Sequence, residues 1–469
     1  MKNTNKNFIY NVVYQVFIFI IPLVSTPYIS RILGVNNIGI YSYTYSLVCY
    51  FMLASMLGIN NYGAREIAKC SSDRNKLSQK FFSIYFLQLI CNILMIIIFY
   101  AFIVFSDYNY KGILIIQSIF LISCAFDINW FFFGIEEFKI TISRNVIIKI
   151  LSLVLIFALV KNNNDLWLYT LIMSISTLIS QVYLWIFIRK RVSFCKVSFK
   201  EIFFHLPQCL ILFIPVIAYS IYRVMDKTMI GFFTNTIELG YYESAEKIIN
   251  IPISFVSALG TVMMPHMAKS SDEELENKFS STFYLCYFFI IPMVLGLLII
   301  SKDFTIMFFG EEFLKTANII IFLLPTVLFA AMTNIIRSNY LIPKSKDKIY
   351  IMSTALGAII NLIFNIIFIK KYGAYGACMG TIAAEFSVLL YQIVYTKKEI
   401  NYLRNLKKLL PIVLKSSIMM IYLIIIGSLI ENIYVKIIVQ MFGAIVIYFI
   451  CNYKYILNDF LGRSGKKNK

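Results

Sequence analysis

The sequence predicts an all-α polytopic membrane protein, and three observations support this fold class. Of the 469 residues, 59% are hydrophobic and only 14% are charged, which is more apolar than a soluble core requires. The apolar residues gather into about fourteen runs long enough to cross a bilayer. Most Lys and Arg residues fall in the segments on one side of the membrane that these runs define.

The first apolar run, residues 8–30, follows Lys2 and Lys6 and has no small-residue cleavage site behind it. We therefore expect an uncleaved first helix. Six spans precede the basic stretch 189–200 and eight follow it. The predicted spans lie near residues 8–30, 38–60, 81–105, 113–133, 146–160, 166–188, 205–234, 239–262, 280–301, 317–340, 349–369, 377–396, 411–430 and 437–455.

The charge distribution predicts the topology. When the N-terminus is placed inside, basic stretches such as 61–80, 189–200 and 397–408 all lie on the cytoplasmic side, so both termini should be cytoplasmic. The net charge of +19 then faces anionic lipids and does not indicate nucleic-acid binding. The nine scattered cysteines and two histidines favour neither a zinc site nor a disulfide framework, and no cofactor is expected.

An internal repeat organises the spans. Residues 38–58, "IGIYSYTYSLVCYFMLASMLG", are similar to residues 239–260, "LGYYESAEKIINIPISFVSALG". Six helices per repeat is an even number, so the two lobes should be related by an axis along the membrane normal, around a central cavity. The predicted domains are an N-lobe (1–200, helices 1–6), a C-lobe (201–398, helices 7–12), and two C-terminal helices with a basic tail (399–469).

Charged residues inside the spans are the candidate functional residues. A charge near the bilayer centre costs roughly 3 kcal/mol, so these side chains should meet each other or water. In the alternative interpretation they are intrahelical ion pairs that neutralise each other. The seventh and eighth predicted spans each carry three such residues at i, i+3 and i+4: Arg223, Asp226 and Lys227, then Glu243, Glu246 and Lys247.

Four more charges lie in or beside apolar runs. Asp127 follows an apolar run and either borders a wet cavity or caps the neighbouring loop. Glu385 falls at the middle of the twelfth span, and Arg31 lies near the outer end of the first. Arg337 lies in the tenth span, close to the position that corresponds to Asp127 in the repeat. In the alternative interpretation its side chain extends to the membrane–water interface.

Tyrosines at alternate positions mark the second predicted span. Tyr41, Tyr43 and Tyr45, with Ser42 and Ser46, could offer a polar face on which sugars stack. The alternative is an interfacial aromatic belt with a seam of small packing residues. The sequence favours the second interpretation.

Three stretches carry a family resemblance. Two lie near the start of the chain and read "PLVSTPYISRILGVNNIGIYSYTYS" and "LGINNYGAREIAK". The third stretch reads Asp127-x-x-Trp130-Phe131-Phe132-x-Gly134-x-Glu136-x-Phe138-Lys139, followed by Arg144-Asn145. The chain resembles Wzx-type polysaccharide repeat-unit flippases, a branch of the multidrug, oligosaccharidyl-lipid and polysaccharide exporter superfamily. The resemblance covers most of the chain and is strongest in the first 150 residues.

That resemblance implies a transporter and not an enzyme. The implied substrate is an oligosaccharide on undecaprenyl diphosphate, flipped across the bacterial cytoplasmic membrane for capsule, O-antigen or a similar polymer. It also implies the polymerase and chain-length proteins of the same pathway as partners. A diphosphate and its sugars need a polar, partly cationic route, because hydrocarbon solvates neither. The candidate substrate-binding residues are Arg31, Arg223, Lys227, Lys247 and Arg337.

Energy for transport would come from an H⁺ or Na⁺ gradient, since no G-x-x-x-x-G-K-[ST] loop is present. The candidate ion-coupling carboxylates are Asp127, Asp226, Glu243 and Glu385. Two alternatives stay open at this point. A multidrug exporter of the same superfamily would favour an acidic, aromatic cavity, and a polysaccharide polymerase or ligase would need a large outer loop with Arg and His.

Overall fold

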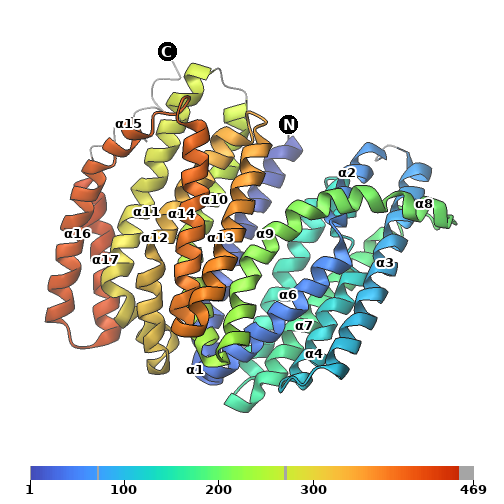
Figure 1. The fold of residues 1–469 in the computed structure, drawn as a ribbon, viewed down its shortest axis with the longest axis horizontal. Coiled ribbons are helices and arrows are strands. Elements are labelled where there is room, and N and C mark those ends of the chain that lie inside the picture. Colours follow the sequence, from blue (N-terminus) through green and yellow to red (C-terminus); the bar gives the residue numbers. More distant parts are fainter. Residues whose placement is uncertain (1, 71–72, 269–271, 454–469) are drawn as a thin grey trace. The chain divides into compact units, whose positions relative to one another are not determined.

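The computed structural model describes residues 2–70, 73–268 and 272–453, and all regular structure in these ranges is helical. The chain divides after Gly240 into two compact units, Met1–Gly240 (unit 1) and Tyr241–Lys469 (unit 2). Figure 1 shows both as bundles of long helices. The all-α polytopic fold predicted from the sequence is thus confirmed. The lobe boundaries at residues 200 and 398, and a cavity shared by the lobes, stay predictions.

Unit 1 contains long helices that pack side by side, together with shorter helices at one end (Figure 1). Its helices are α1 (Lys2–Met56), α2 (Ile59–Cys70), α3 (Arg74–Phe105), α4 (Lys111–Ala125), α5 (Asn129–Gly134), α6 (Phe138–Leu159), α7 (Leu166–Ile188), α8 (Phe199–Phe204) and α9 (Leu206–Phe233), with a 3₁₀ turn at Asn163–Asp165. The first residues of α10 (Thr236–Ala268) also belong to this unit.

The first two predicted spans form one continuous helix, α1, with a break at Gly34. Gly34 has φ 72° and ψ 171°, a backbone conformation that costs little only without a Cβ atom. Arg31 precedes this break by less than one turn. The break at Gly34 thus lies between the two predicted spans, residues 8–30 and 38–60.

Unit 2 contains the rest of α10 and the remaining helices, among which α13 packs on α14 and α11 on α12 (Figure 1). The terminal pair packs on α11, where Lys436 Nζ lies 3.1 Å from Asp303 Oδ2. The helices are α11 (Asp272–Phe309), α12 (Leu314–Ile336), α13 (Asp347–Tyr372), α14 (Ala374–Thr396), α15 (Tyr402–Lys407), α16 (Leu410–Leu429) and α17 (Ile433–Cys451), with a 3₁₀ turn at Glu311–Phe313 and a π-helical turn at Arg337–Leu341.

Helices stand at each of the fourteen predicted spans. Within the described ranges, eleven segments are long and apolar enough to cross a membrane. The first of these segments, Ile21–Cys70, contains the end of the predicted span 8–30 and all of the span 38–60. The helices α9 and α10 lie at the predicted spans 205–234 and 239–262. The basic tail at 454–469 lies outside the described residues.

Candidate functional site

A polar contact joins α1 and α9 within unit 1. Thr228 Oγ1 on α9 donates to Ser46 Oγ at 2.9 Å and lies 3.3 Å from Tyr50 Oη, both on α1. Less than one turn further along α9, a Cβ atom added to Gly231 would lie 2.2 Å from Tyr43 Cδ2. Glycine at 231 therefore lets the Tyr43 ring lie directly on the α9 backbone.

The charged residues of α9 are next to this contact. Asp226 is only 6% exposed and Lys227 is half-buried, whereas Arg223 is exposed. The Asp226 carboxylate interacts electrostatically with Tyr50, and the Lys227 ammonium with Tyr45. Unit 1 therefore brings Asp226 and Lys227 to the tyrosine-bearing side of α1, inside a pair of helices that are otherwise mostly apolar.

The tyrosines of α1 do not share one environment. Tyr43, Ser42 and Ser46 are buried in the packing of unit 1. Tyr41 and Tyr45 are half-buried and their rings stack, with centroids 5.9 Å apart. The small-residue packing interpretation thus accounts for the buried residues, while the rings of Tyr41 and Tyr45 keep part of their surface exposed.

Asp127 lies in the turn between α4 and α5, and its side chain accepts hydrogen bonds from Asn129, the first residue of α5. Its Oδ1 accepts a hydrogen bond from the backbone N–H of Asn129 at 3.0 Å and another from Asn129 Nδ2 at 2.7 Å. Asn129 Oδ1 accepts from Arg144 Nη2 at 3.1 Å, and Arg144 also donates to the Ser180 carbonyl at 2.9 Å. The carboxylate is thus held by a polar network that joins the α4–α5 turn to α6 and α7.

Sequence reasoning missed the amides that hold this break in the helix. Gln88 Nε2 donates to the Asp127 carbonyl at 2.8 Å, and Gln88 Oε1 accepts from Trp130 Nε1 at 2.9 Å. Asn92, four residues later on α3, donates to Ser55 Oγ at 2.6 Å and to the Leu121 carbonyl at 2.8 Å. The available signal was two amides at i and i+4 inside an apolar run, the spacing of one helix face.

In unit 2, Glu243 and Lys247 form an ion pair on α10. Glu243 Oε1 lies 3.8 Å from Lys247 Nζ, one helical turn away, and the Lys247 side chain is the more exposed of the two. This geometry matches the intrahelical pairing that the sequence left open as an alternative. A pair of this kind lowers the cost of placing both charges in a span.

Glu385 is half-buried on α14 and shares a helix face with Thr381, four residues before it. Thr381 Oγ1 lies 3.2 Å from Tyr242 Oη on α10. The chain crosses unit 2 in alternating directions, so α10 and α14 run parallel. Glu246, four residues after Tyr242, and Glu385 are therefore each one turn beyond the same inter-helix contact.

Arg337 begins the π-helical turn after α12 and is half-buried. Its Nη2 donates to Asn334 Oδ1 at 2.8 Å, and its guanidinium lies 5.7 Å from the centroid of the Tyr350 ring. Arg31, by contrast, is exposed on α1. The structure thus places the predicted residues in several separate settings. Asp226 and Lys227 lie against α1, Asp127 belongs to the α4–α5 network, Arg337 lies in the turn after α12, and the others lie on α1, α9, α10 and α14.

The fold and the charges inside its spans define a polytopic membrane protein of the transporter type. The chain belongs to the polysaccharide biosynthesis protein family, whose model matches residues 4–271.

Similar proteins agree with this assignment. The chain is 24% identical to a Shigella dysenteriae protein named as an O-antigen transporter, over 81% of this chain and 96% of that protein. Among solved structures, it is similar to an inward closed conformation of the lipid II flippase MurJ, with a TM-score of 0.68, 20% identity, and coverage of 92% of this chain and 98% of that one. An inward-facing multidrug transporter of the MATE family and MOP superfamily gives a TM-score of 0.55 at 13% identity, covering 82% and 99%. The structural likenesses show a shared fold.

Proposed function

We propose that this protein flips lipid-linked oligosaccharides, as undecaprenyl-diphosphate-linked repeat units, across the cytoplasmic membrane of a bacterium, with both termini cytoplasmic. The observation that carries the proposal is the match to the O-antigen transporter along 96% of that protein's length. The matched family model, which covers more than half of the chain, supports the same function. The protein acts in this proposal as a transporter and not as an enzyme.

Moving a diphosphate and its sugars across a bilayer requires cationic and aromatic side chains of the kind that the candidate site contains. A polyprenyl tail stays in lipid, but the diphosphate and the sugars need hydrogen bonds and positive charge throughout the crossing of about 30 Å of hydrocarbon. Lys227, placed against the tyrosines of α1, supplies a cation in that setting. The half-exposed rings of Tyr41 and Tyr45 offer surfaces for sugar stacking. Arg31, Arg223, Lys247 and Arg337 remain the further candidates for binding diphosphate or acidic sugars.

Transport is coupled in this proposal to an H⁺ or Na⁺ gradient through alternating access. A half-buried carboxylate can bind a cation or proton in one state and release it in the other. The candidates are Asp127, Asp226, Glu243 and Glu385. Replacing all four with their amides should make transport in proteoliposomes insensitive to an imposed gradient. If the quadruple variant still responds to the gradient, these carboxylates do not couple it to transport.

Complementation of a flippase-deficient strain with defined repeat units tests the function itself. The protein should restore surface polymer and lower the amount of lipid-linked repeat units that accumulates inside, without changing drug sensitivity. Lys227→Gln should lose most of this activity, whereas Lys227→Arg should keep it because the charge is retained. Drug resistance without restored polymer would instead support the multidrug alternative.

A further inference from the structure

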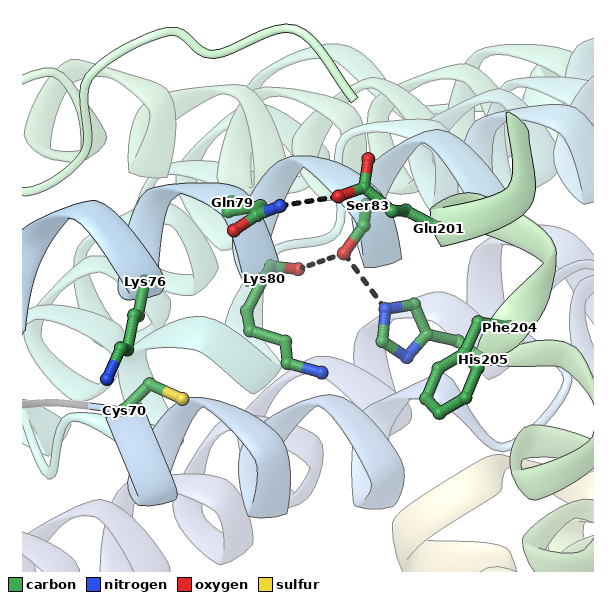
Figure 2. A pocket seen from close by; sticks show the side chains of 8 residues that line it. All are labelled: Cys70, Lys76, Gln79, Lys80, Ser83, Glu201, Phe204 and His205. Atoms are coloured by element: carbon green, nitrogen blue, oxygen red, sulfur yellow. Dashed lines mark hydrogen bonds between the residues drawn. The ribbon is translucent and has the colours of Figure 1, made fainter. Parts of the chain in front are cut away.

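A pocket of about 300 Å³ opens in unit 1 where α2 ends and α3 begins, and where α8 precedes α9 (Figure 2). It lies apart from the α1–α9 contact and from the Asp127 network. Its lining side chains come from two stretches that are distant in the sequence, the α2–α3 junction and residues 201–205. They are Cys70, Lys76, Gln79, Lys80, Ser83, Glu201, Phe204 and His205.

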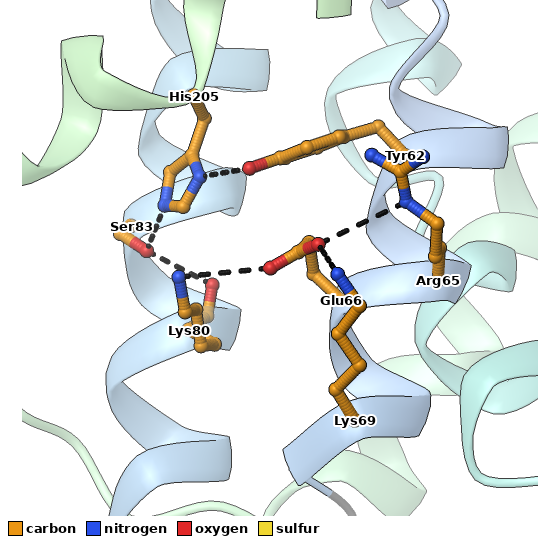
Figure 3. A network of polar contacts seen from close by, with 7 residues as sticks. All are labelled: Tyr62, Arg65, Glu66, Lys69, Lys80, Ser83 and His205. Carbon is orange, nitrogen blue, oxygen red and sulfur yellow. Dashed lines mark hydrogen bonds and ion pairs between the residues drawn. The ribbon is translucent and has the colours of Figure 1, made fainter. Parts of the chain in front are cut away.

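The pocket has an excess of positive charge. Lys76 and Lys80 lie one turn apart on α3, and Lys76 is 75% exposed, with Nζ 3.7 Å from Asp73 Oδ2. Lys80 Nζ lies 3.8 Å from Glu66 Oε2. Figure 3 shows that Glu66 is shared, because Lys69 Nζ at 2.7 Å and Arg65 Nε at 3.9 Å also approach it. One carboxylate thus serves three cations.

Glu201 forms no ion pair with these lysines among the contacts of the described residues. Its oxygens accept hydrogen bonds from neutral donors, so it keeps its negative charge, and the lining holds two lysines against this one carboxylate. Ser198 donates to Glu201 Oε2 from its backbone N–H at 2.7 Å and from its hydroxyl at 3.0 Å, and Gln79 donates to Oε1. The donors at Ser198, followed by Gln79, hold the pKa of Glu201 below its usual value. Glu201 therefore completes the capping box of α8, whose N-cap is Ser198, and joins α8 to α3 through Gln79.

A hydrogen-bonded chain holds the back of the pocket (Figure 3). Ser83 Oγ donates its proton to the Lys80 carbonyl at 3.0 Å, so it accepts from His205 Nε2 at 2.9 Å. The other ring nitrogen, Nδ1, then accepts from Tyr62 Oη at 2.6 Å. His205, only 2% exposed, is thereby assigned as the neutral Nε2–H tautomer and links α2, α3 and the start of α9.

The segment that leads into α8 and lines one part of the pocket carries exposed aromatic and basic side chains. The segment 194–204 exposes four phenylalanines, and Lys80 Nζ lies 5.9 Å from the centroid of one of them, Phe204. The four are Phe194, Phe199, Phe203 and Phe204. The same part of the chain carries Lys196 and Lys200, which are both exposed. Exposed aromatic rings next to lysines at the end of membrane-spanning helices are typical of a segment that lies in the lipid headgroup region.

We propose that this pocket binds the phosphate-bearing headgroup of an anionic phospholipid, with Lys76 and Lys80 at the phosphate and Phe204 against the acyl chains. Ammonium groups form strong, charge-assisted hydrogen bonds with phosphate oxygens, which matches the two lysines on one face of α3. The exposed phenylalanines favour a lipid over a soluble phosphate, because a soluble anion leaves that apolar surface in water. A bound lipid of this kind would fix the ends of α3 and α9 to the membrane surface.

The test is native mass spectrometry of the delipidated full-length protein, titrated with phosphatidylglycerol or phosphatidylcholine. The double variant Lys76→Gln/Lys80→Gln should bind phosphatidylglycerol roughly thirtyfold more weakly, and Lys76→Gln alone roughly fivefold more weakly, with phosphatidylcholine binding unchanged. The single variant is informative because so exposed a side chain does not affect folding. Inorganic phosphate serves as the soluble competitor and should displace little of the lipid.

The matched control is Lys111→Gln/Lys161→Gln, which removes the same charge at the opposite ends of the unit 1 helices. It should leave phosphatidylglycerol binding as in the unchanged protein. Equal losses in both double variants would show a general charge effect and overturn the proposal. Phosphatidylglycerol binding that survives in Lys76→Gln/Lys80→Gln, or full displacement by inorganic phosphate, would also overturn it.

Discussion

Asp127 and Asn129 form a closed local pair, in which one carboxylate oxygen accepts both the backbone and the side-chain N–H of Asn129. This pair allows a carboxylate to lie between two short apolar helices, because two donors replace water. It also orients the Asn129 amide oxygen toward Arg144. The position therefore has a structural role whether or not it binds a coupling ion.

Replacing Asp127 with Ala should lower the free energy of unfolding by about 1 to 2 kcal/mol, because both hydrogen bonds from Asn129 to its carboxylate are lost. Asp127→Asn should lose less, since its amide oxygen can still accept from residue 129. Thermal unfolding in detergent measures both. An Asp127→Ala protein as stable as the unchanged one would show that the hydrogen bonds between Asp127 and Asn129 do not stabilise the fold.

Removing the Thr228 hydroxyl should weaken the packing of α9 on α1. Thr228→Val keeps the shape and loses the bond to Ser46, with an expected cost of about 0.6 kcal/mol, the average for such bonds inside membranes. Thr234→Val is the control at the C-cap of the same helix, since the Thr234 hydroxyl donates only to the Ile230 carbonyl of α9 among the contacts described. A double-mutant cycle with Ser46→Ala isolates the interaction energy between Thr228 and Ser46. A coupling energy of zero would argue against this contact.

Gly231→Ala should be clearly destabilising, by about 1 to 3 kcal/mol, because the new Cβ would displace the Tyr43 ring. The control is Gly296→Ala on α11, where an added Cβ meets nothing within 4 Å and helix propensity favours alanine. Chemical denaturation of the two variants measures the difference. Similar stabilities would mean that Tyr43 can move aside at little cost.

The stability of the protein should fall in acid through His205, which lies in the turn between α8 and α9. Burial first, and the nearby Lys80 second, lower the pKa of His205 from 6.5 to about 4. Between these values the unfolded chain binds the proton and the folded chain does not. The stabilisation is therefore complete above pH 6.5 and is lost as the pH falls toward 4, by roughly 3 kcal/mol in all.

Thermal unfolding at pH 7.5, 6 and 5 checks this slope. His205→Gln cannot titrate, so its unfolding temperature should change less over the same range. Parallel pH profiles for the two proteins would show that other groups cause the acid sensitivity.

The sequence by itself determined the spans, the all-α class and the polar spacing of single helices. Apolar length against bilayer thickness is a local property, and so is the i, i+4 spacing of Gln88 and Asn92. Even the local role of Asp127 could be predicted as one of two alternatives, since its partner is two residues away.

The tertiary structure decided which polar groups meet. Tyr62, Ser83 and His205 form one chain, and Lys80 and Phe204 line one pocket, although up to 143 residues separate the members. Likewise, only packing revealed that Gly231 receives the Tyr43 ring and that Arg144 reaches Asn129. The sequence pattern of a helix fixes which residues share a face. Which helix packs against that face depends on how distant parts of the chain fold together. Because an unpaired polar group in the bilayer is costly, helices whose polar groups can pair are favoured as neighbours.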